Sequence, residues 1–240
     1  MVNYIKAEFL KQKNSFNQKI IWLVPMVVVI ISFLLMGAGY VQTASYNWWN
    51  VLFLPFTFTY ISASIMKKEK KYNYHGLFGI VQNKKKLWYA KIAIGTIYLL
   101  VTCLLFFVIT MFAGFIFVKQ ITVVNNLLAS LLLFLTFAWQ IPLFMLITLK
   151  LNMFVSILIS LVCNLMIACI CAVESYWWVP FSIPARLMCP VIKVLPNGLL
   201  MSNDNPLSSN QVIIPGILIT VVLYVVLNII TAKIFEKQEM

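Results

Sequence analysis

Acidic residues and histidine are scarce in this sequence. Its 240 residues include 6 Asp and Glu and 1 His, and charged residues make up 10% of the chain. Metal sites and acid–base catalysis need several such side chains close together. The only histidine, His75, lies in a lysine-rich segment, and the long apolar runs carry no Asp, Glu or His away from their ends. The sequence therefore predicts neither catalytic nor metal-binding residues, and it disfavours ion-coupled transport, which normally depends on buried ionisable groups.

Three further features are missing. A GxxxxGK[ST] loop does not occur, so this chain is not expected to hold a nucleotide in the usual way. No cleavable signal peptide is expected, because residues 1–19 are polar and basic and precede a full-length apolar run. Of the 5 cysteines, only Cys189 falls outside the predicted spans, which predicts no disulfide framework. If the chain moves a substrate uphill, another chain must supply the energy.

Apolar residues dominate what is present. They make up 62% of the chain, and the mean hydropathy is +0.96, whereas soluble domains carry about 45–50% apolar and about 25% charged residues. The chain is therefore predicted to be an integral membrane protein. Its net charge of +12 could suggest a nucleic acid partner, but the lysines are spread between the apolar runs rather than gathered in one basic domain. No nucleic acid partner is predicted.

The apolar runs predict six transmembrane helices, in an all-α fold with one transmembrane domain over residues 1–240. Each run meets the roughly 20 residues that a helix needs to cross about 30 Å of hydrocarbon. We expect a short outer turn at residues 41–47 and a kink at Pro142, which cannot donate to the Ala138 carbonyl. The predicted spans lie at about residues 20–40, 48–66, 88–117, 127–149, 153–173 and 212–234.

The lysines predict the orientation of these spans. Most of the 18 Lys and Arg lie in the two termini, in segment 67–91 and at Lys150, whereas only Lys119, Arg186 and Lys193 lie on the opposite side. Loops rich in lysine and arginine stay in the cytoplasm. Both termini are therefore expected to be cytoplasmic.

Two cytoplasmic segments are amphipathic. Residues 1–19 predict an interfacial helix with its lysines at the headgroups. Within the lysine-rich segment 67–91, the uncharged residues 72–81 predict a short helix presented to a cytoplasmic partner. The alternative is a helix lying on anionic lipid headgroups, which lysine clusters also favour. The candidate partner-binding residues are Tyr72, Asn73, Tyr74, His75, Gly76, Leu77 and Phe78.

Small and weakly polar residues recur every four positions along the fifth predicted span. Small residues let helices approach closely, and an asparagine can hydrogen-bond across the contact. The stripe therefore predicts a helix-packing face, either inside this chain or against a second membrane subunit. Its members are Ser156, Ser160, Asn164 and Ala168.

The outer segment 174–211 is too broken by proline to span the membrane and too apolar to be a free loop. We interpret it as short helices that lie at or dip into the outer interface, anchored by Tyr176, Trp177 and Trp178. Glu174 is a candidate contact for a cationic substrate, together with the two tryptophans. The alternative is that Glu174 is an interfacial residue held by lipid headgroups.

Three stretches carry a family resemblance: the pattern NYIKAEFLKQKNSFNQKI with the proline at position 25, the loop end NKKKLWYAKI at residues 83–92, and IPARLMCPVIKVLPNGL at residues 183–199. The chain resembles the permease subunits of type-2 ABC exporters, and more narrowly the lantibiotic-immunity permeases of the MutE/EpiE family. The resemblance implies that residues 1–19 form a connecting helix, that residues 72–81 form a coupling helix seated on an ATPase, and that segment 174–211 is re-entrant.

The resemblance also implies the partners. They are two copies of an ATP-binding subunit, which holds the ATP and magnesium, and a second, related permease; this chain itself carries no cofactor. The implied substrate is a cationic lantibiotic peptide that is expelled from the cell membrane of a Gram-positive bacterium. Two alternatives stay open: a permease for another peptide or a lipid-like substrate, and a membrane sensor or accessory subunit that does not transport.

Overall fold

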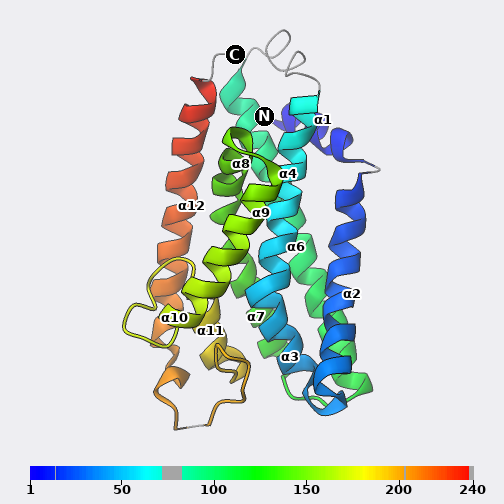
Figure 1. The fold of residues 1–240 in the computed structure, drawn as a ribbon, viewed down its shortest axis with the longest axis vertical. Coiled ribbons are helices and arrows are strands. Elements are labelled where there is room, and N and C mark those ends of the chain that lie inside the picture. The colour runs from blue at the N-terminus through cyan, green and yellow to red at the C-terminus, as the bar shows by residue number, and fades with distance from the viewer. Residues whose placement is uncertain (14, 72–82, 203, 238–240) are drawn as a thin grey trace.

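The computed structural model describes residues 1–13, 15–71, 83–202 and 204–237, and no strand forms within these ranges. The long helices run side by side in one elongated bundle (Figure 1). Five helices are long and apolar enough to cross a membrane, and the bent pair α7 (Val123–Phe137) and α8 (Gln140–Lys150) makes a sixth if counted as one span. The predicted all-α membrane fold is confirmed.

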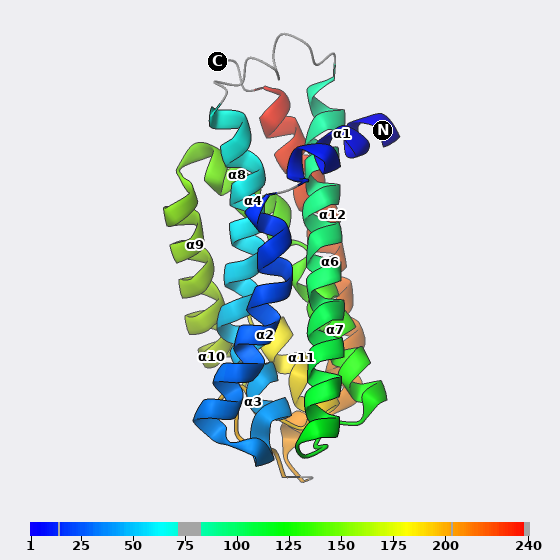
Figure 2. The same ribbon diagram turned by 90° about the vertical axis from the view of Figure 1, so that its right-hand side faces the viewer.

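The first helix and the end of the last helix lie at the same end of the bundle. Helix α1 (Val2–Gln12) lies across one end of the bundle (Figure 2), and α12 (Ile213–Glu236) finishes at that same end. Two other helices cross the bundle unbroken, α2 (Phe16–Met36) and α6 (Lys84–Ile116). The remaining elements are η1 (Ala38–Tyr40), α3 (Val41–Trp48), η2 (Trp49–Phe53), α4 (Leu54–Lys71), α9 (Met153–Val162), η3 (Cys163–Ile167), α10 (Ala168–Cys171), α11 (Ile183–Ile192), η4 (Pro206–Ser208) and η5 (Asn210–Val212).

The expected turn at residues 41–47 is wrong, because these residues form α3 and continue through η2 into α4. The chain reverses earlier, at Gly37, whose φ of 73° suits a glycine. The polar side chains of α3 have partners inside the bundle. The Gln42 amide accepts from the Gln120 backbone N–H at 2.8 Å and donates to the Thr110 carbonyl at 3.0 Å. With its polar groups paired, this uncharged stretch can be buried in the bundle.

The kink predicted at Pro142 is confirmed. Helices α7 and α8 meet at 42°, and Pro142 is the third residue of α8. Proline has no N–H to donate four residues back. The Ala138 carbonyl instead accepts from the Ile141 N–H at 3.1 Å, which is a tighter turn than an α-helix makes.

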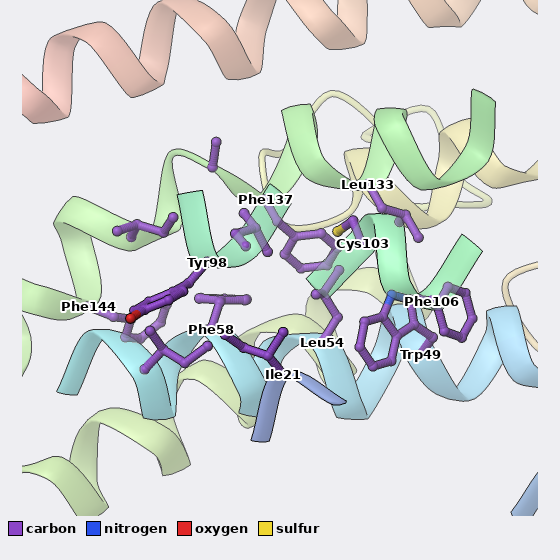
Figure 3. Close-up of a cluster of buried hydrophobic side chains, with 14 of the residues drawn as sticks. Ile21, Trp49, Leu54, Phe58, Tyr98, Cys103, Phe106, Leu133, Phe137 and Phe144 are labelled. Carbon is purple, nitrogen blue, oxygen red and sulfur yellow. The ribbon is translucent and has the colours of Figure 1, made fainter. Parts of the chain in front are cut away.

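Helix α4 occupies the centre of the bundle. The span that contains α4 buries 67% of its most apolar window, against 11% for the span that ends with α12. Aromatic rings fill the space between α4, α6, α7 and α8 (Figure 3). Trp49 stacks on Phe106 with ring centroids 4.4 Å apart, and Phe58 packs against Phe137 and Phe144 at 5.6 and 6.1 Å. The outer rim of the bundle is left for lipid or for other subunits.

Part of the outer segment is inside the bundle. Every residue of α11 is buried, and the helix packs on α7, α10 and α12. Arg186 is buried with it and donates to the Leu207 carbonyl at 2.7 Å. Tyr176 and Trp178, in contrast, are exposed. The segment therefore combines one packed helix with an exposed aromatic stretch.

Candidate functional site

Helix α1 turns a polar face toward the bundle. The side chains of Glu8 and Gln12 are buried, while Val2, Phe9 and Leu10 are exposed. The Glu8 carboxylate lies 2.8 Å from the Nζ of Lys91 on α6, and both side chains are almost completely excluded from solvent. The contact joins residues 83 positions apart in the chain. A buried ion pair therefore fixes α1 to the beginning of α6.

Burial makes the two charges of this pair depend on each other. Taking two charges out of water costs several kcal/mol per ion, which their mutual attraction offsets only while both are present. Removing one partner of such a pair costs about 3–5 kcal/mol, because the other charge is left buried and unpaired. Lys11 shares the Glu8 carboxylate at 2.8 Å and is itself half exposed. Glu8 thus holds two lysines with one carboxyl group.

The sequence did not reveal this pair. Lys91 was grouped with the lysines of the cytoplasmic segment 67–91, and Glu8 was one acid among the lysines of residues 1–19. One signal was available: Lys91 comes three residues after Trp88, on a helix whose apolar run has already begun. A lysine at that place needs a partner, and Glu8 is the only acid in the first 60 residues.

The beginning of α6 is also joined to the end of α12. The rings of Trp88 and Phe235 stack with centroids 4.5 Å apart, and the indole N–H of Trp88 donates to the Thr231 hydroxyl at 2.9 Å. Lys85 and Glu236 form an ion pair of 2.8 Å, with both side chains about half exposed. The first two turns of α6 therefore hold α1 on one side and α12 on the other.

The candidate partner-binding residues Tyr72, Asn73, Tyr74, His75, Gly76, Leu77 and Phe78 lie outside the described residues. The ends of the segment that carries them are described. Helix α4 ends at Lys71 and α6 begins at Lys84, with the Asn83 side chain accepting from the Lys86 N–H at 3.0 Å as an N-cap. Segment 72–82 thus leads directly into the part of α6 that holds α1 and α12.

The predicted stripe on the fifth span is buried. Each of its first three members has a hydrogen-bond partner on another helix or turn of this chain. Ser156 bonds Thr148 at 2.8 Å, Ser160 accepts from Thr59 at 2.7 Å, and Ala168 packs with Ala172 and Ala185. These side chains hold α9 and α10 against α4, α8 and α11, so they pack within this chain. The opposite face of α9, with Phe154 and Leu158, is exposed.

The third member, Asn164, forms a reciprocal amide pair with Gln140 at 2.8 and 2.9 Å. Asn164 lies in the π-helix η3, and Gln140 begins α8 immediately after the kink. One hydrogen-bonded pair therefore joins the π-helix η3 to the start of α8, next to the kink. Both amides are satisfied, so this polar contact stabilises packing and does not present free groups to a passing ion.

The three substrate-path candidates lie on the stretch that follows α10, at the end of the bundle opposite α1 (Figure 1). Glu174 and Trp178 are exposed, and Trp177 is half-buried, with its carbonyl accepting from the Ser182 hydroxyl at 3.0 Å. A groove of about 590 Å³ begins one residue earlier, at Val173. None of the three candidates lines this groove. Within the described ranges, no group of three His, Cys, Asp or Glu side chains could hold a metal.

Comparison with known proteins identifies the family. The family model described as ABC-2 family transporter protein matches residues 4–168, which run from α1 to the start of α10. No curated protein and no solved structure matches the chain. The match includes the α1–α6 junction and the bent span, and it ends before the outer segment. The chain therefore belongs to the ABC-2 transporter family, and it is a multi-pass membrane permease that has no catalytic activity of its own and implies an ABC ATP-binding partner.

Proposed function

We propose that this permease expels a lantibiotic, or a similar cationic antimicrobial peptide, from the membrane and so gives the producing cell immunity. The proposal places both termini in the cytoplasm of a Gram-positive cell. It pairs the chain with a second, related permease and with two copies of an ATP-binding subunit that holds ATP and magnesium. This extends the resemblance of residues 3–25, 83–92 and 183–199 to the immunity permeases.

The observation that carries the proposal is the exposed stretch after α10. It offers the Glu174 carboxylate and the exposed rings of Tyr176 and Trp178 at the end of the bundle opposite α1. A carboxylate and aromatic faces suit a ligand that is both cationic and apolar. Among the described residues, the buried charged side chains are Glu8, Lys91 and Arg186, all with partners, so the bundle interior supports no ion path.

The energy for export is proposed to enter at the α1 end. Segment 72–81 would seat on the ATP-binding subunit and move the first turns of α6. Because Lys91 is paired with Glu8 and Trp88 is stacked on Phe235, α1 and α12 would move with α6. A displacement of this one loop would then move three helices together.

The proposal is tested by measuring whether the chain gives resistance to a lantibiotic, and whether that resistance depends on ATP hydrolysis. The chain is produced with its ATP-binding subunit and second permease in a susceptible bacterium, and the inhibitory concentration of a lantibiotic is measured. It should rise, and the rise should vanish when the nucleotide-binding lysine of the ATPase is replaced. No rise with the chain present in the membrane would contradict the proposal. A rise that survives an inactive ATPase would favour a sensor or accessory subunit.

A further inference from the structure

The groove at the end of α10 has walls from three separate stretches of chain. Cys169 and Val173 come from the end of the fifth span, Pro196 and Asn197 from a tight turn, and Asn205 and Pro206 from the stretch that leads to α12. The groove holds about 590 Å³ and is lined mainly by apolar side chains. That volume lies within the roughly 300–1,000 Å³ of ordinary ligand sites.

The walls of the groove are held in place by the rest of the fold. The turn at Pro196 closes through Gly198, which has a φ of 88° and donates its N–H to the Leu195 carbonyl at 2.8 Å. A Cβ on Gly198 would lie 2.6 Å from the Asn47 amide nitrogen, so this turn sits directly on the α3 end of the bundle. On the other wall, buried Arg186 anchors the Leu207 carbonyl. A groove with walls fixed in this way requires little ordering when a ligand binds.

The charges around the groove favour a cation. Glu174 directly follows the lining residue Val173, and Asp204 directly precedes the lining residue Asn205. Both carboxylates are exposed. The one exposed cation of the outer segment is Lys193, because Arg186 is buried. An anionic lipid headgroup would be repelled by two carboxylates, whereas a cationic peptide would be attracted.

We propose that this groove is the site from which the exported peptide leaves: an apolar side chain of the peptide lies in the groove, and its cationic groups lie against Glu174 and Asp204. The inference rests on the proposed function and adds to it a place and two named contacts. It places the cationic contacts at Glu174 and Asp204, each of which is next in the chain to a residue that lines the groove.

A native cysteine reports on occupancy. Cys169 is exposed on the groove wall, whereas Cys171 is half-buried and does not line the groove. Cys189 is buried in α11, where desolvation raises the pKa of its thiol to about 11, so it is a poor nucleophile. Alkylation of the intact chain by a small maleimide, located by mass spectrometry, therefore measures access to the groove at Cys169 and uses Cys171 as an internal control.

The probe is a synthetic amphipathic peptide of lysines and leucines, with a control peptide in which glutamates replace the lysines. At about ten times its Kd, a bound ligand leaves about one site in eleven free, so the lysine peptide should slow alkylation of Cys169 about tenfold. Cys171 should be unaffected, and the glutamate peptide should protect neither cysteine. A photocrosslinking group on the lysine peptide should also attach to residues 195–197 or 205–207.

Variants that remove charges around the groove test whether those charges contribute to peptide binding. Each exposed ion pair is worth about 1.4- to fivefold in affinity, so Glu174→Gln combined with Asp204→Asn should raise the Kd of the lysine peptide by about two- to 25-fold. Lys193→Gln removes the nearby cation and should leave the Kd unchanged or lower it. Equal protection of Cys169 by both peptides would mean that the groove accepts any apolar chain, as a lipid would supply, and would overturn the proposal.

The outcomes separate this inference from the proposed function. Lantibiotic resistance without any protection or crosslinking at the groove would overturn the groove as the exit site and leave export intact. Protection at Cys169 without resistance in cells would overturn immunity and leave a cationic peptide site. Resistance that falls in the Glu174→Gln, Asp204→Asn double variant at equal membrane abundance would support both.

Discussion

Among the single residues of this protein, Glu8 and Lys91 form its most demanding contact. Each charge is buried and is tolerable only because the other is present. A sequence shows the two charges but not their separation of 2.8 Å, because the contact depends on how α1 crosses the bundle. The charge pattern predicted one interfacial helix over residues 1–19, whereas α1 ends at Gln12 and α2 begins at Phe16. Only the folded chain places Glu8 of α1 against α6.

The first prediction concerns this pair. Glu8→Gln should lower the free energy of unfolding by about 3–5 kcal/mol, because it removes the carboxylate that the buried Lys91 contacts. Lys91→Met should cost less, because Lys11 still contacts the Glu8 carboxylate at 2.8 Å. The double variant should recover most of the loss. Thermal unfolding of the purified protein in lipid nanodiscs measures all three variants against the parent, as a double-mutant cycle.

The half-exposed pair of Lys85 and Glu236 is the matched control. Glu236→Gln should change the free energy of unfolding by about 1 kcal/mol or less, since water screens an exposed pair. If Glu8→Gln costs no more than Glu236→Gln, then Lys91 reaches water and the junction is not closed in the functional protein.

At the level of elements, hydropathy predicted the spans well because a membrane requires about 20 apolar residues for each crossing. It failed at α3, where Gln42, Thr43 and Ser45 read as a loop. Gln42 and Thr43 bond to residues 68 and 77 positions away, which local sequence cannot reveal, whereas Ser45 donates to the Val41 carbonyl of its own helix. The kink was predictable from Pro142 alone, whereas the π-helices η2 and η3 left no clear mark in the sequence.

The second prediction concerns the packing of α9 on α4. Ser160 is fully buried and its hydroxyl accepts from Thr59, so Ser160→Leu should overpack this contact and cost about 1–3 kcal/mol. The neighbouring Leu161 lines an apolar groove on the bundle surface, and Leu161→Ile should be tolerated. The yield of monodisperse protein in size-exclusion chromatography compares the two. Equal yields would mean that α9 packs loosely on α4.

The third prediction concerns segment 72–82. Phe78→Ala should uncouple ATP hydrolysis from transport or release the ATPase, because apolar anchors usually dominate an interface. Lys85→Ala should do neither, since rim charges contribute little. Co-purification of the ATPase and peptide-stimulated hydrolysis are the two measurements. If Phe78→Ala leaves both intact while Lys85→Ala abolishes membrane association, the segment lies on lipid.

At the scale of the whole molecule, composition can predict the lack of catalytic residues but not the position of the groove. The scarcity of acids and histidine predicted a chain without catalytic residues, because side chains that are absent cannot be assembled by folding, whereas the permease was predicted from the family resemblance. The groove could not be predicted, because its walls come from stretches around residues 170, 196 and 206, which only the fold brings together. Glu174 is a candidate from its charge alone, whereas Asp204 becomes a candidate only because it precedes Asn205, which lines the groove.

The fourth prediction concerns orientation. If both termini are cytoplasmic, a membrane-impermeant thiol reagent should label Ser208→Cys in intact cells and Asn73→Cys only after lysis. The parent chain provides the background from Cys169, the exposed native cysteine. Labelling of Asn73→Cys in intact cells would invert the topology, and the groove would then face the cytoplasm.

The ion pair between α1 and α6 also sets an order of events during biosynthesis. Glu8 leaves the ribosome 83 residues before Lys91, which at roughly 5–20 residues per second is an interval of about 4–17 seconds. During that time α2 and the α3–α4 span enter the membrane while Glu8 lacks Lys91 and has Lys11, of its own helix, as a cationic partner. Helix α1 can dock only after α6 arrives. Although α1 is synthesised first, it therefore reaches its final position later than the two spans that follow it. A nascent chain in which the third span is late or misinserted would keep α1 undocked, with Glu8 and Gln12 accessible to the cell's quality-control machinery.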